Sequence, residues 1–142
     1  MIVSTVNVNG IRAAVRQRSP DNLGLLAWLA ATRADVVCLQ ETRADDDQVA
    51  AALAPALADG WHLASAEPHL KGRSGVAVLS RLPITAARPL ECDEFSTHGR
   101  YLEVDVAGTT VASVYVQTGE AETDRQLEKE RFLTVLAKRM AE

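Results

Sequence analysis

The stretch Asp35-Val36-Val37-Cys38-Leu39-Gln40-Glu41-Thr42 decides the fold of this chain. Its first half is an uninterrupted apolar run rich in β-branched residues, which is typical of a strand buried on both faces. Glu41 closes that strand and is therefore expected at the rim of the core. Because burying an unpaired carboxylate is costly, we expect Glu41 to meet a cation, a hydrogen-bond donor or water. A solvated strand end is the simpler interpretation of a lone glutamate, and the other strands decide between the two.

The composition is that of one globular domain. Of the 142 residues, 47% are hydrophobic, 24% are charged and only 4% are aromatic, so the core must consist mainly of Val, Leu and Ala. The formal net charge of −4 argues against binding a polyanion through bulk charge, and leaves room for a local basic surface or a metal. Two cysteines form no disulfide framework, which favours a reducing, cytoplasmic setting. No apolar run is long enough to cross a membrane.

Alternation and turn signals predict the order of strands and helices. The predicted strands are residues 2–8, 36–39, 61–66, 76–80, 100–106 and 109–116. Helices are predicted to begin at Ser19-Pro20, at a capping box of Asp45 with Gln48, and at a second capping box of Thr123 with Gln126. The residues expected to pack the last helix against the core are Phe132, Leu133, Leu136 and Met140. The order strand, helix, strand at the start predicts two parallel neighbouring strands.

Three of the predicted strands place a polar side chain near the carboxyl end: Asn7, Glu41 and Tyr115. Ligand sites in open α/β sheets lie outside the carboxyl ends of the strands. A carboxylate with an amide oxygen begins a site for Mg²⁺, a hard cation that takes oxygen ligands and keeps several waters. One carboxylate alone makes no strong site. The neighbouring loops add basic residues, which indicates phosphate as the ligand class. These residues are Arg12, Arg43, Lys71 and Arg73.

Four short motifs follow one another along the chain: Asn7-Val8-Asn9-Gly10-Ile11-Arg12, Leu39-Gln40-Glu41-Thr42, Gly72-Arg73-Ser74-Gly75-Val76-Ala77 and Val114-Tyr115-Val116. As an ordered set they resemble the exonuclease III and apurinic/apyrimidinic endonuclease family, within the endonuclease/exonuclease/phosphatase superfamily. The resemblance covers nearly all of the chain. It implies an α/β fold, specifically the N-terminal half of a layered α/β sandwich, with mixed, largely antiparallel β-sheets flanked by helices.

The resemblance also implies roles for the matching residues. Glu41 is expected to bind Mg²⁺, with Mn²⁺ as a substitute, and Asn7 to lie beside the metal. Asn9 stands where relatives also place a polar or acidic side chain near the metal. Tyr115 matches the active-site tyrosine that hydrogen-bonds near the scissile phosphate. The basic residues in or beside loops that contact DNA in relatives are Arg12, Arg43 and Arg73, and Lys71 adjoins the last of these.

Two departures from the family pattern bear on activity. Gln117 and Thr118 stand where the family usually has Pro and then Asn or Ser. The family's Gly-Asp-x-Asn and Ser-Asp-His segments have no counterpart here, so residues 1–142 are expected to be a domain truncated at its C-terminus. None of the three histidines is expected to replace those segments, and His98 is expected in an exposed loop.

The parent activity implied is Mg²⁺-dependent hydrolysis of DNA phosphodiesters, by a 3′–5′ exodeoxyribonuclease and abasic-site endonuclease of base-excision repair. The chain alone is expected to be an incomplete and inactive part of that enzyme, with a partner chain or the missing C-terminal half completing its core. One alternative is a superfamily phosphatase acting on lipid or nucleotide phosphates, although the motifs at residues 7–12 and 71–75 favour the nuclease branch. The other is a non-catalytic fragment that only binds DNA or a partner chain, which the early end at Glu142 favours.

Overall fold

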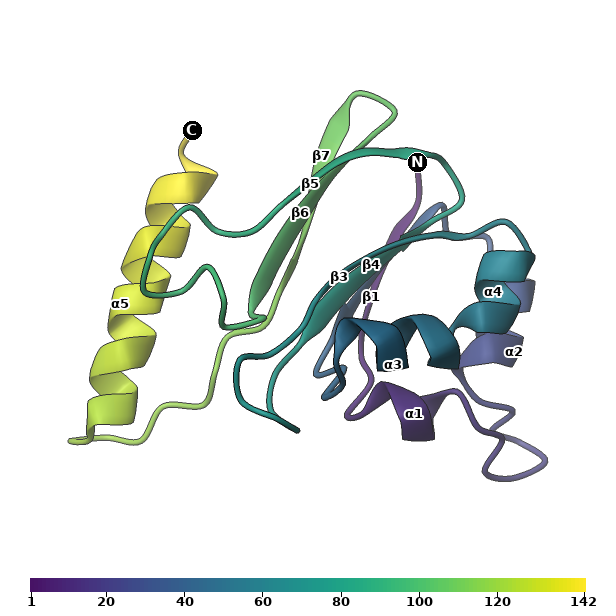
Figure 1. The fold of residues 1–142 in the computed structure, drawn as a ribbon, viewed down its shortest axis with the longest axis horizontal. Helices are drawn as coiled ribbons and strands as arrows, with labels where there is room; N and C mark the ends of the chain where they lie inside the picture. Colours follow the sequence, from purple (N-terminus) through teal and green to yellow (C-terminus); the bar gives the residue numbers. More distant parts are fainter.

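The computed structural model describes all 142 residues as four layers, helices, sheet, sheet and helix (Figure 1). The first sheet has the spatial order β1 (Val3–Asn7), β2 (Val36–Gln40), β4 (Val76–Ser80), β3 (His62–Ala66). The second has the order β5 (Ile84–Arg88), β6 (Tyr101–Val106), β7 (Thr109–Val114). The first sheet is covered by α1 (Ile11–Ala14), α2 (Leu25–Ala31), α3 (Asp46–Ala52) and α4 (Ala54–Ala58). Helix α5 (Asp124–Met140) covers the second sheet. The predicted α/β layering, with two mixed or antiparallel sheets flanked by helices, is confirmed.

Alternate residues of β2 enter two different cores. Val37 and Leu39 pack with the helices of the first layer, whereas Val36 and Cys38 pack against β6 of the second sheet. All four side chains are at most 4% exposed. Because each face of the strand meets an apolar layer, the run has no polar residue before Gln40. The prediction of a strand buried on both faces is confirmed.

The strand pairings agree with the expected connections. β1 runs parallel to β2, in a register that places Val3 beside Val36 and Asn7 beside Gln40. β2 and β4 are antiparallel, which makes the sheet mixed. The predicted hairpin joins β6 and β7, and both turn residues, Ala107 (φ 49°) and Gly108 (φ 77°), adopt the left-handed conformation that two-residue hairpin turns favour.

The helix expected from Ser19-Pro20 begins six residues later, at Leu25, so this prediction is wrong. The Oγ of Ser19 accepts a hydrogen bond from the backbone N–H of Asn22 at 3.0 Å, which closes a turn instead of capping a helix. A serine hydroxyl can either cap a helix or close a turn, and in this structure Ser19 closes a turn. Gly24 then starts the helix at φ 87°, with its Cα close to the backbone of Arg16.

Three further local features differ from the sequence prediction. Residues 11–14, expected as a loop, form α1, since Ile11 is fully buried in the first core. Residues 84–88 form the edge strand β5, which the sequence analysis missed because Thr85 and Ala87 are exposed and give little apolar signal. The capping box at Asp45 is confirmed. That at Thr123 is wrong, because its Oγ1 donates to the carbonyl oxygen of Glu120.

Helix α5 packs through fewer residues than predicted. Phe132 is fully buried and Leu136 packs beside it, together with Val135. Leu133 is 39% and Met140 79% exposed, so the expectation that these two residues pack against the core is wrong. The apolar stripe of the helix is therefore narrow, and ion pairs supplement it.

Glu103 joins α5 to the outer face of the second sheet. This carboxylate of β6 is 2% exposed, and it accepts hydrogen bonds from Arg139 of α5 at 2.7 and 3.0 Å. Arg88 of β5 donates to it at 2.7 Å, and the Tyr101 hydroxyl also donates to it. These contacts, the Arg139 hydrogen bonds first, lower the pKa of Glu103 to about 2. The buried negative charge of Glu103 is thus paired with two arginines and hydrogen-bonded by a tyrosine.

We predict that Glu103→Gln lowers the free energy of unfolding by about 3 kcal/mol, because it leaves two arginines short of their carboxylate. The folded pKa of about 2 lies below the ordinary value of 4.5, so the stabilisation is present above pH 4.5 and is lost as the pH falls toward 2. Urea denaturation at a series of pH values measures both effects. Glu142→Gln is the matched control, because Glu142 pairs with the same arginine and is 55% exposed. Equal shifts for the two variants would contradict the prediction.

Candidate active site

A strained turn at the end of β2 presents Glu41. Glu41 (φ 54°) and Arg43 (φ 52°) are both in the left-handed conformation, on either side of buried Thr42. The backbone N–H groups of Thr42 and Arg43 donate to the carbonyl oxygens of Gly75 (3.0 Å) and Ser74 (2.9 Å). Non-glycine residues adopt this conformation at a cost, so these hydrogen bonds to the opposite loop hold the turn in place.

Gly75 makes this close approach of the two loops possible. It lies at φ +88°, and a Cβ at this position would collide with the hydroxyl of Thr42 and press on the backbone N of Arg43. Its own N–H donates to the carbonyl oxygen of Gly99 at 2.9 Å, which joins a third loop to the pair. The second glycine of the 72–77 motif is therefore required by the geometry of the Glu41 turn.

Two side chains hold the carboxylate of Glu41. Asn7 donates from Nδ2 to Oε1 at 2.8 Å, and Arg43 donates from Nη2 to Oε2 at 2.6 Å. The Glu41 side chain is 15% exposed. The hydrogen bond from Asn7 is the main cause that holds the pKa of Glu41 below its usual value; burial opposes it and Arg43 assists it. Glu41 is thus a charged group at neutral pH, and the expected meeting of Asn7 and Glu41 at adjacent strand ends is confirmed.

Asn9 contributes to this cluster through its backbone. Its N–H donates to Oδ1 of Asn7 at 3.1 Å, which orients the Asn7 amide so that Nδ2 faces Glu41. The Asn9 side chain itself is exposed and makes no hydrogen bond within the protein. The expectation that the Asn9 side chain lies near a bound metal stays a prediction.

Tyr115 comes directly after β7 and lines the same pocket as Glu41. Its backbone N–H donates to the carbonyl oxygen of Arg100 at 2.8 Å, so the ladder between β6 and β7 continues past the end of β7. Burial first, and then the negative charge of Glu41, raise the pKa of Tyr115. At neutral pH the residue is therefore a neutral hydroxyl, suited to donating a hydrogen bond and not to nucleophilic attack.

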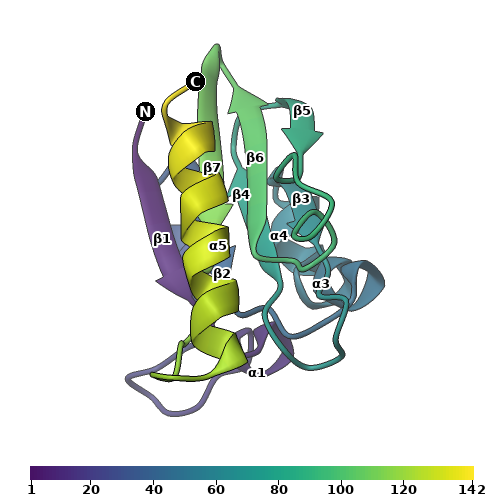
Figure 2. The ribbon, with the colours of Figure 1, turned by 90° about the vertical axis from the view of Figure 1, so that its left-hand side faces the viewer.

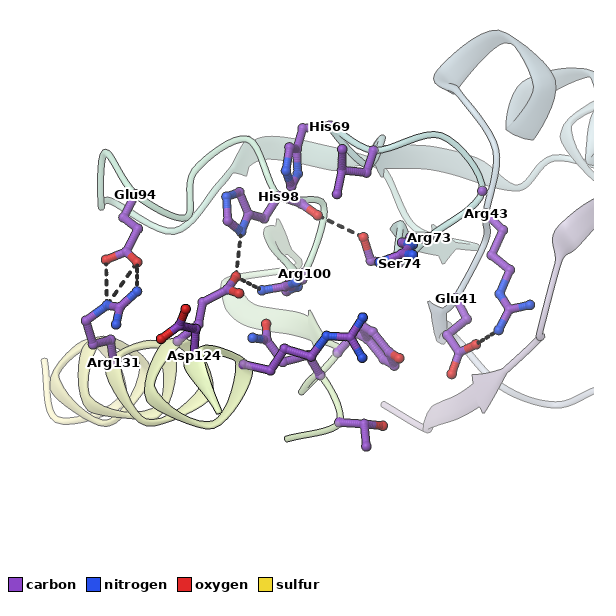
Figure 3. Close-up of a pocket in the computed structure, with 17 residues that line it drawn as sticks. Glu41, Arg43, His69, Arg73, Ser74, Glu94, His98, Arg100, Asp124 and Arg131 are labelled. Carbon is purple, nitrogen blue, oxygen red and sulfur yellow. Dashed lines mark hydrogen bonds and ion pairs between the residues drawn. The ribbon is translucent and has the colours of Figure 1, made fainter. Parts of the chain in front are cut away.

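The pocket is a polar cavity of about 820 Å³ between the Glu41 turn and α5. Glu41 and Arg43 lie at one end, and Glu94 and Arg131 lie at the other (Figure 3). Of the 17 residues that line it only two are hydrophobic, which suits a charged, hydrated ligand better than an apolar one. Figure 2 shows the molecule from the side of α5. The first two turns of this helix contribute Asp124, Arg125, Glu128 and Arg131 to the lining of the pocket.

Arginines dominate the pocket despite the net negative charge of the chain. Three of the five are ion-paired: Arg43 with Glu41 (2.6 Å), Arg100 with Glu128 (2.8 Å) and Arg131 with Glu94 (2.6 Å). Arg73 and Arg125 line the same cavity and make no ion pair. These two side chains are the cations available to an anionic ligand.

The other basic residues named from the sequence are distributed unevenly. Arg12 and Arg43 line a second, smaller cavity of about 450 Å³, together with Arg16 and Gly72. Arg43 thus lies between the two cavities, and Lys71 is exposed and lines neither. Sequence reasoning missed Arg16, Arg100 and Arg125 as lining residues. Arg16 could have been found from its position in the basic segment 12–18, whereas nothing local to Arg100 or Arg125 signals the pocket.

His98 is not the exposed loop residue that was expected. Its side chain is 16% exposed, its ring stacks on that of His69 with a centroid separation of 4.2 Å, and its Nδ1 lies 3.6 Å from Glu128. Burial, followed by the positive charges of His69 and Arg100, lowers the pKa of His98. Neither His98 nor Glu128 is among the groups that shift the pKa of Glu41, so this pair is not a base beside that carboxylate.

The donor set around Glu41 fits Mg²⁺ in a particular way. No three His, Cys, Asp or Glu side chains gather closely enough to hold a metal by themselves. Mg²⁺ is commonly bound by one or two carboxylates together with waters and substrate phosphates, and an ionised, partly exposed Glu41 beside an amide meets that minimum. The residues fit a metal that is completed by phosphate, and they do not form a closed protein cage.

Arg73 is a predicted DNA contact, and it is an unpaired arginine in the pocket. If it contacts phosphate, Arg73→Glu is expected to weaken DNA binding regardless of sequence. The slope of log affinity against log salt concentration should fall by about one unit. Fluorescence anisotropy of a labelled duplex over a salt series measures both quantities. Arg33→Glu is the control, since Arg33 is exposed and lines neither of the two cavities. Identical losses in the two variants would show that only total charge matters.

Comparison with known proteins identifies the family. Residues 4–141 match the Endonuclease/Exonuclease/phosphatase family. The chain is 31% identical over 120 residues to an exodeoxyribonuclease of Bacillus subtilis (strain 168), covering 84% of this chain and 44% of that protein. None of the helices has the length and apolar content of a membrane span.

Solved structures show the same architecture over a similar share of their length. An AP endonuclease from Archaeoglobus fulgidus superposes with a TM-score of 0.80 at 24% identity, over 96% of this chain and 49% of the other. The 3′ phosphatase NExo from Neisseria, bound to a product DNA hairpin, superposes with a TM-score of 0.78 at 26% identity, over the same two shares. The chain spans about half the length of the relatives it matches, and the resemblance inferred from the four motifs is confirmed. The chain belongs to the Endonuclease/Exonuclease/phosphatase family.

Proposed function

We propose that this chain carries the metal-binding part of an Mg²⁺-dependent DNA phosphodiesterase, a 3′–5′ exodeoxyribonuclease and abasic-site endonuclease of base-excision repair. The observation that carries the proposal is the ionised Glu41, held by Asn7 at the mouth of a polar pocket in which Arg73 and Arg125 are unpaired. A carboxylate for a cation beside arginines for an anion is the arrangement that phosphodiester chemistry needs. The family match and the names of the relatives support the choice of DNA.

Each residue of the site has a defined task under this proposal. Glu41 supplies carboxylate oxygens to Mg²⁺ or Mn²⁺. Asn7 lies beside the metal and holds that carboxylate through Nδ2, and Asn9 orients Asn7 through its backbone N–H. When bound, the metal polarises the phosphate and stabilises the leaving oxygen. Tyr115, neutral at physiological pH, donates a hydrogen bond to the phosphate. Arg12, Lys71 and Arg73 bind the DNA backbone outside the reacting phosphate.

A superfamily phosphatase is the second candidate, and one observation favours it. The Neisseria relative is described as a 3′ phosphatase, at 26% identity. The substrate classes are separable by assaying one enzyme preparation on a recessed 3′ end, an abasic-site duplex, a 3′-phosphorylated duplex and a nucleotide monophosphate. Activity confined to the monophosphate would overturn the DNA assignment.

The second sheet lacks a strand opposite β1. Val36 and Cys38 face the space between the sheets, and their register partners on β1, Val3 and Thr5, therefore face the same way. Yet Val3 is 48% exposed and Thr5 is exposed, because β7 ends the second sheet above β2 and β4. The inter-sheet layer is thus uncovered along its β1 side.

We propose that the partner of this surface is the missing C-terminal half of the fold, adding a strand beside β7. β7 is an edge strand of the second sheet, so its outer side presents backbone N–H and C=O groups with which a further strand can pair. An apolar strip left open would favour self-association of the isolated chain. The same half is the expected source of the groups that activate water, since the side chains acting on Glu41 are Asn7, Arg43 and Tyr115, and none of them is a histidine or a carboxylate.

We predict that the isolated chain does not cleave an abasic-site duplex or a recessed 3′ end in Mg²⁺ or Mn²⁺, because the side chains acting on Glu41, which are Asn7, Arg43 and Tyr115, include no histidine or carboxylate to activate water. Gel assays measure cleavage, and Glu41→Gln controls for contaminating nuclease. Cleavage that disappears in the Glu41→Gln preparation would contradict the prediction. Addition of the C-terminal half of the Bacillus relative should restore some activity if the two pieces pack.

We predict that Glu41→Gln, which keeps the shape and removes the charge, weakens Mn²⁺ binding at least tenfold and abolishes activity in the completed enzyme. Manganese titration followed by electron paramagnetic resonance measures the first effect, and single-turnover cleavage measures the second. Asp46→Asn is the matched control, because Asp46 is an exposed carboxylate of α3 that lines neither cavity. Unchanged manganese affinity in Glu41→Gln would remove Glu41 from the metal site.

A further inference from the structure

Arg43 occupies the carboxylate that the proposed metal needs. Its Nη2 lies 2.6 Å from Oε2 of Glu41, and the two side chains point toward each other (Figure 3). Oε1 is held separately by Asn7. A divalent cation binding to Glu41 therefore competes with the guanidinium for Oε2, while Asn7 can keep the carboxylate in place.

Arg43 has an alternative destination close at hand. Its side chain is 44% exposed and lines both cavities, the one shared with Glu41 and the one lined by Arg12 and Arg16. Its backbone is fixed independently of the ion pair: its N–H donates to Ser74, and Nη2 of Arg12 donates to its carbonyl oxygen at 3.5 Å. Release of Arg43 from Glu41 therefore requires only a movement of its side chain. The second cavity can receive that side chain, and it is also lined by Arg12 and Arg16, which form no ion pairs.

We propose that Arg43 is shared between Glu41 and DNA phosphate, so that it neutralises Glu41 in the metal-free chain and binds a phosphodiester once a divalent cation takes its place. The inference rests on the proposed metal role of Glu41 and adds a coupling to it. A guanidinium forms strong, directional hydrogen bonds with either a carboxylate or a phosphate. The Arg43 guanidinium cannot pair fully with Glu41 and with a phosphate at the same time. A metal ion at Glu41 therefore makes Arg43 available to DNA.

This arrangement has a reciprocal thermodynamic consequence. If metal raises the affinity for DNA by a given factor, DNA must raise the affinity for metal by the same factor. The metal-free chain would hold DNA weakly at this site, because Arg43 is neutralised there. Stable metal binding would then accompany phosphate binding, which agrees with a protein ligand set too small to close around the ion.

The first experiment titrates Mn²⁺ into the 142-residue chain without DNA, followed by electron paramagnetic resonance. Arg43→Gln removes the competing cation, and we expect it to tighten Mn²⁺ binding roughly threefold to tenfold. Arg73→Gln is the matched control, because it removes the same charge from the same cavity at a residue with no ion pair. Arg73→Gln should change the Mn²⁺ affinity less than twofold, because Arg73 acts on the metal site only through long-range electrostatics. Circular dichroism confirms that each variant is folded.

The second experiment measures DNA affinity by anisotropy in EDTA and in saturating Mg²⁺ at matched ionic strength. The unmodified chain should bind a labelled duplex more tightly with Mg²⁺. Arg73→Gln should bind more weakly in both buffers and keep the gain. Arg43→Gln should lose most of the gain.

The outcomes separate this inference from the proposed function. Manganese binding that survives Glu41→Gln would overturn the metal site and the coupling with it. Loss of binding in Glu41→Gln, with equal effects of Arg43→Gln and Arg73→Gln, would overturn the coupling alone. Weaker manganese binding in Arg43→Gln would do the same, because the arginine would then support the metal and not compete with it. A full Mg²⁺-dependent gain in Arg43→Gln would mean that the metal bridges to phosphate without the arginine.

Discussion

β2 is covered by helices on one face and by the second sheet on the other, and the rest of the structure depends on this double burial. A strand in that position has no accessible side chain within the sheet, so its first polar groups with access to solvent stand at its end. The backbone must also turn sharply there to leave the core. Glu41 and Arg43 adopt left-handed conformations on either side of Thr42 in that turn, which the hydrogen bonds to Ser74 and Gly75 hold in place. The position of the Glu41 carboxylate is therefore a consequence of how β2 ends.

Charge at the site is organised locally and is not visible in the total. The chain has a net charge of −4, yet its polar pocket contains five arginines. Three of them form ion pairs with glutamates, which holds their side chains in place and reduces the repulsion among the arginines. Arg73, from the loop before β4, and Arg125, from the first turn of α5, line the cavity without an ion pair. Binding of a polyanion by such a protein depends on position and on salt, not on bulk charge.

The second sheet and α5 supply the opposite wall of the pocket. α5 is held against β6 by two kinds of contact, the fully buried Phe132 of its apolar stripe and the hydrogen bonds from Arg139 to the buried Glu103. The same placement sets Arg125 and Glu128 beside the cavity. A half-open sandwich of this kind has a finished site wall on one side and an uncovered β1 strip on the other, where Val3 is 48% exposed. Metal, phosphate and the remaining half of the fold are thus proposed to converge on neighbouring parts of one surface.

The sequence by itself determined the strands of the first sheet, the β6–β7 hairpin and the meeting of Asn7 with Glu41. These follow from local rules: the apolar period of buried strands, the two-residue turn at Ala107-Gly108, and the common edge of parallel neighbours. Tertiary structure decided the edge strand β5, because its pairing with β6 forms only in the folded chain. The start of α2 and the absence of a Thr123 cap depend on hydrogen bonds of Ser19 and Thr123 within short turns, which compete with helix capping and which the sequence pattern does not distinguish from it. Tertiary structure also decided that Arg100, Arg125 and His98 line the pocket, because residues from distant loops meet there only after both sheets have packed. The pairing of Arg43 with Glu41 has the same origin, since the turn that joins them is held by a loop more than thirty residues away.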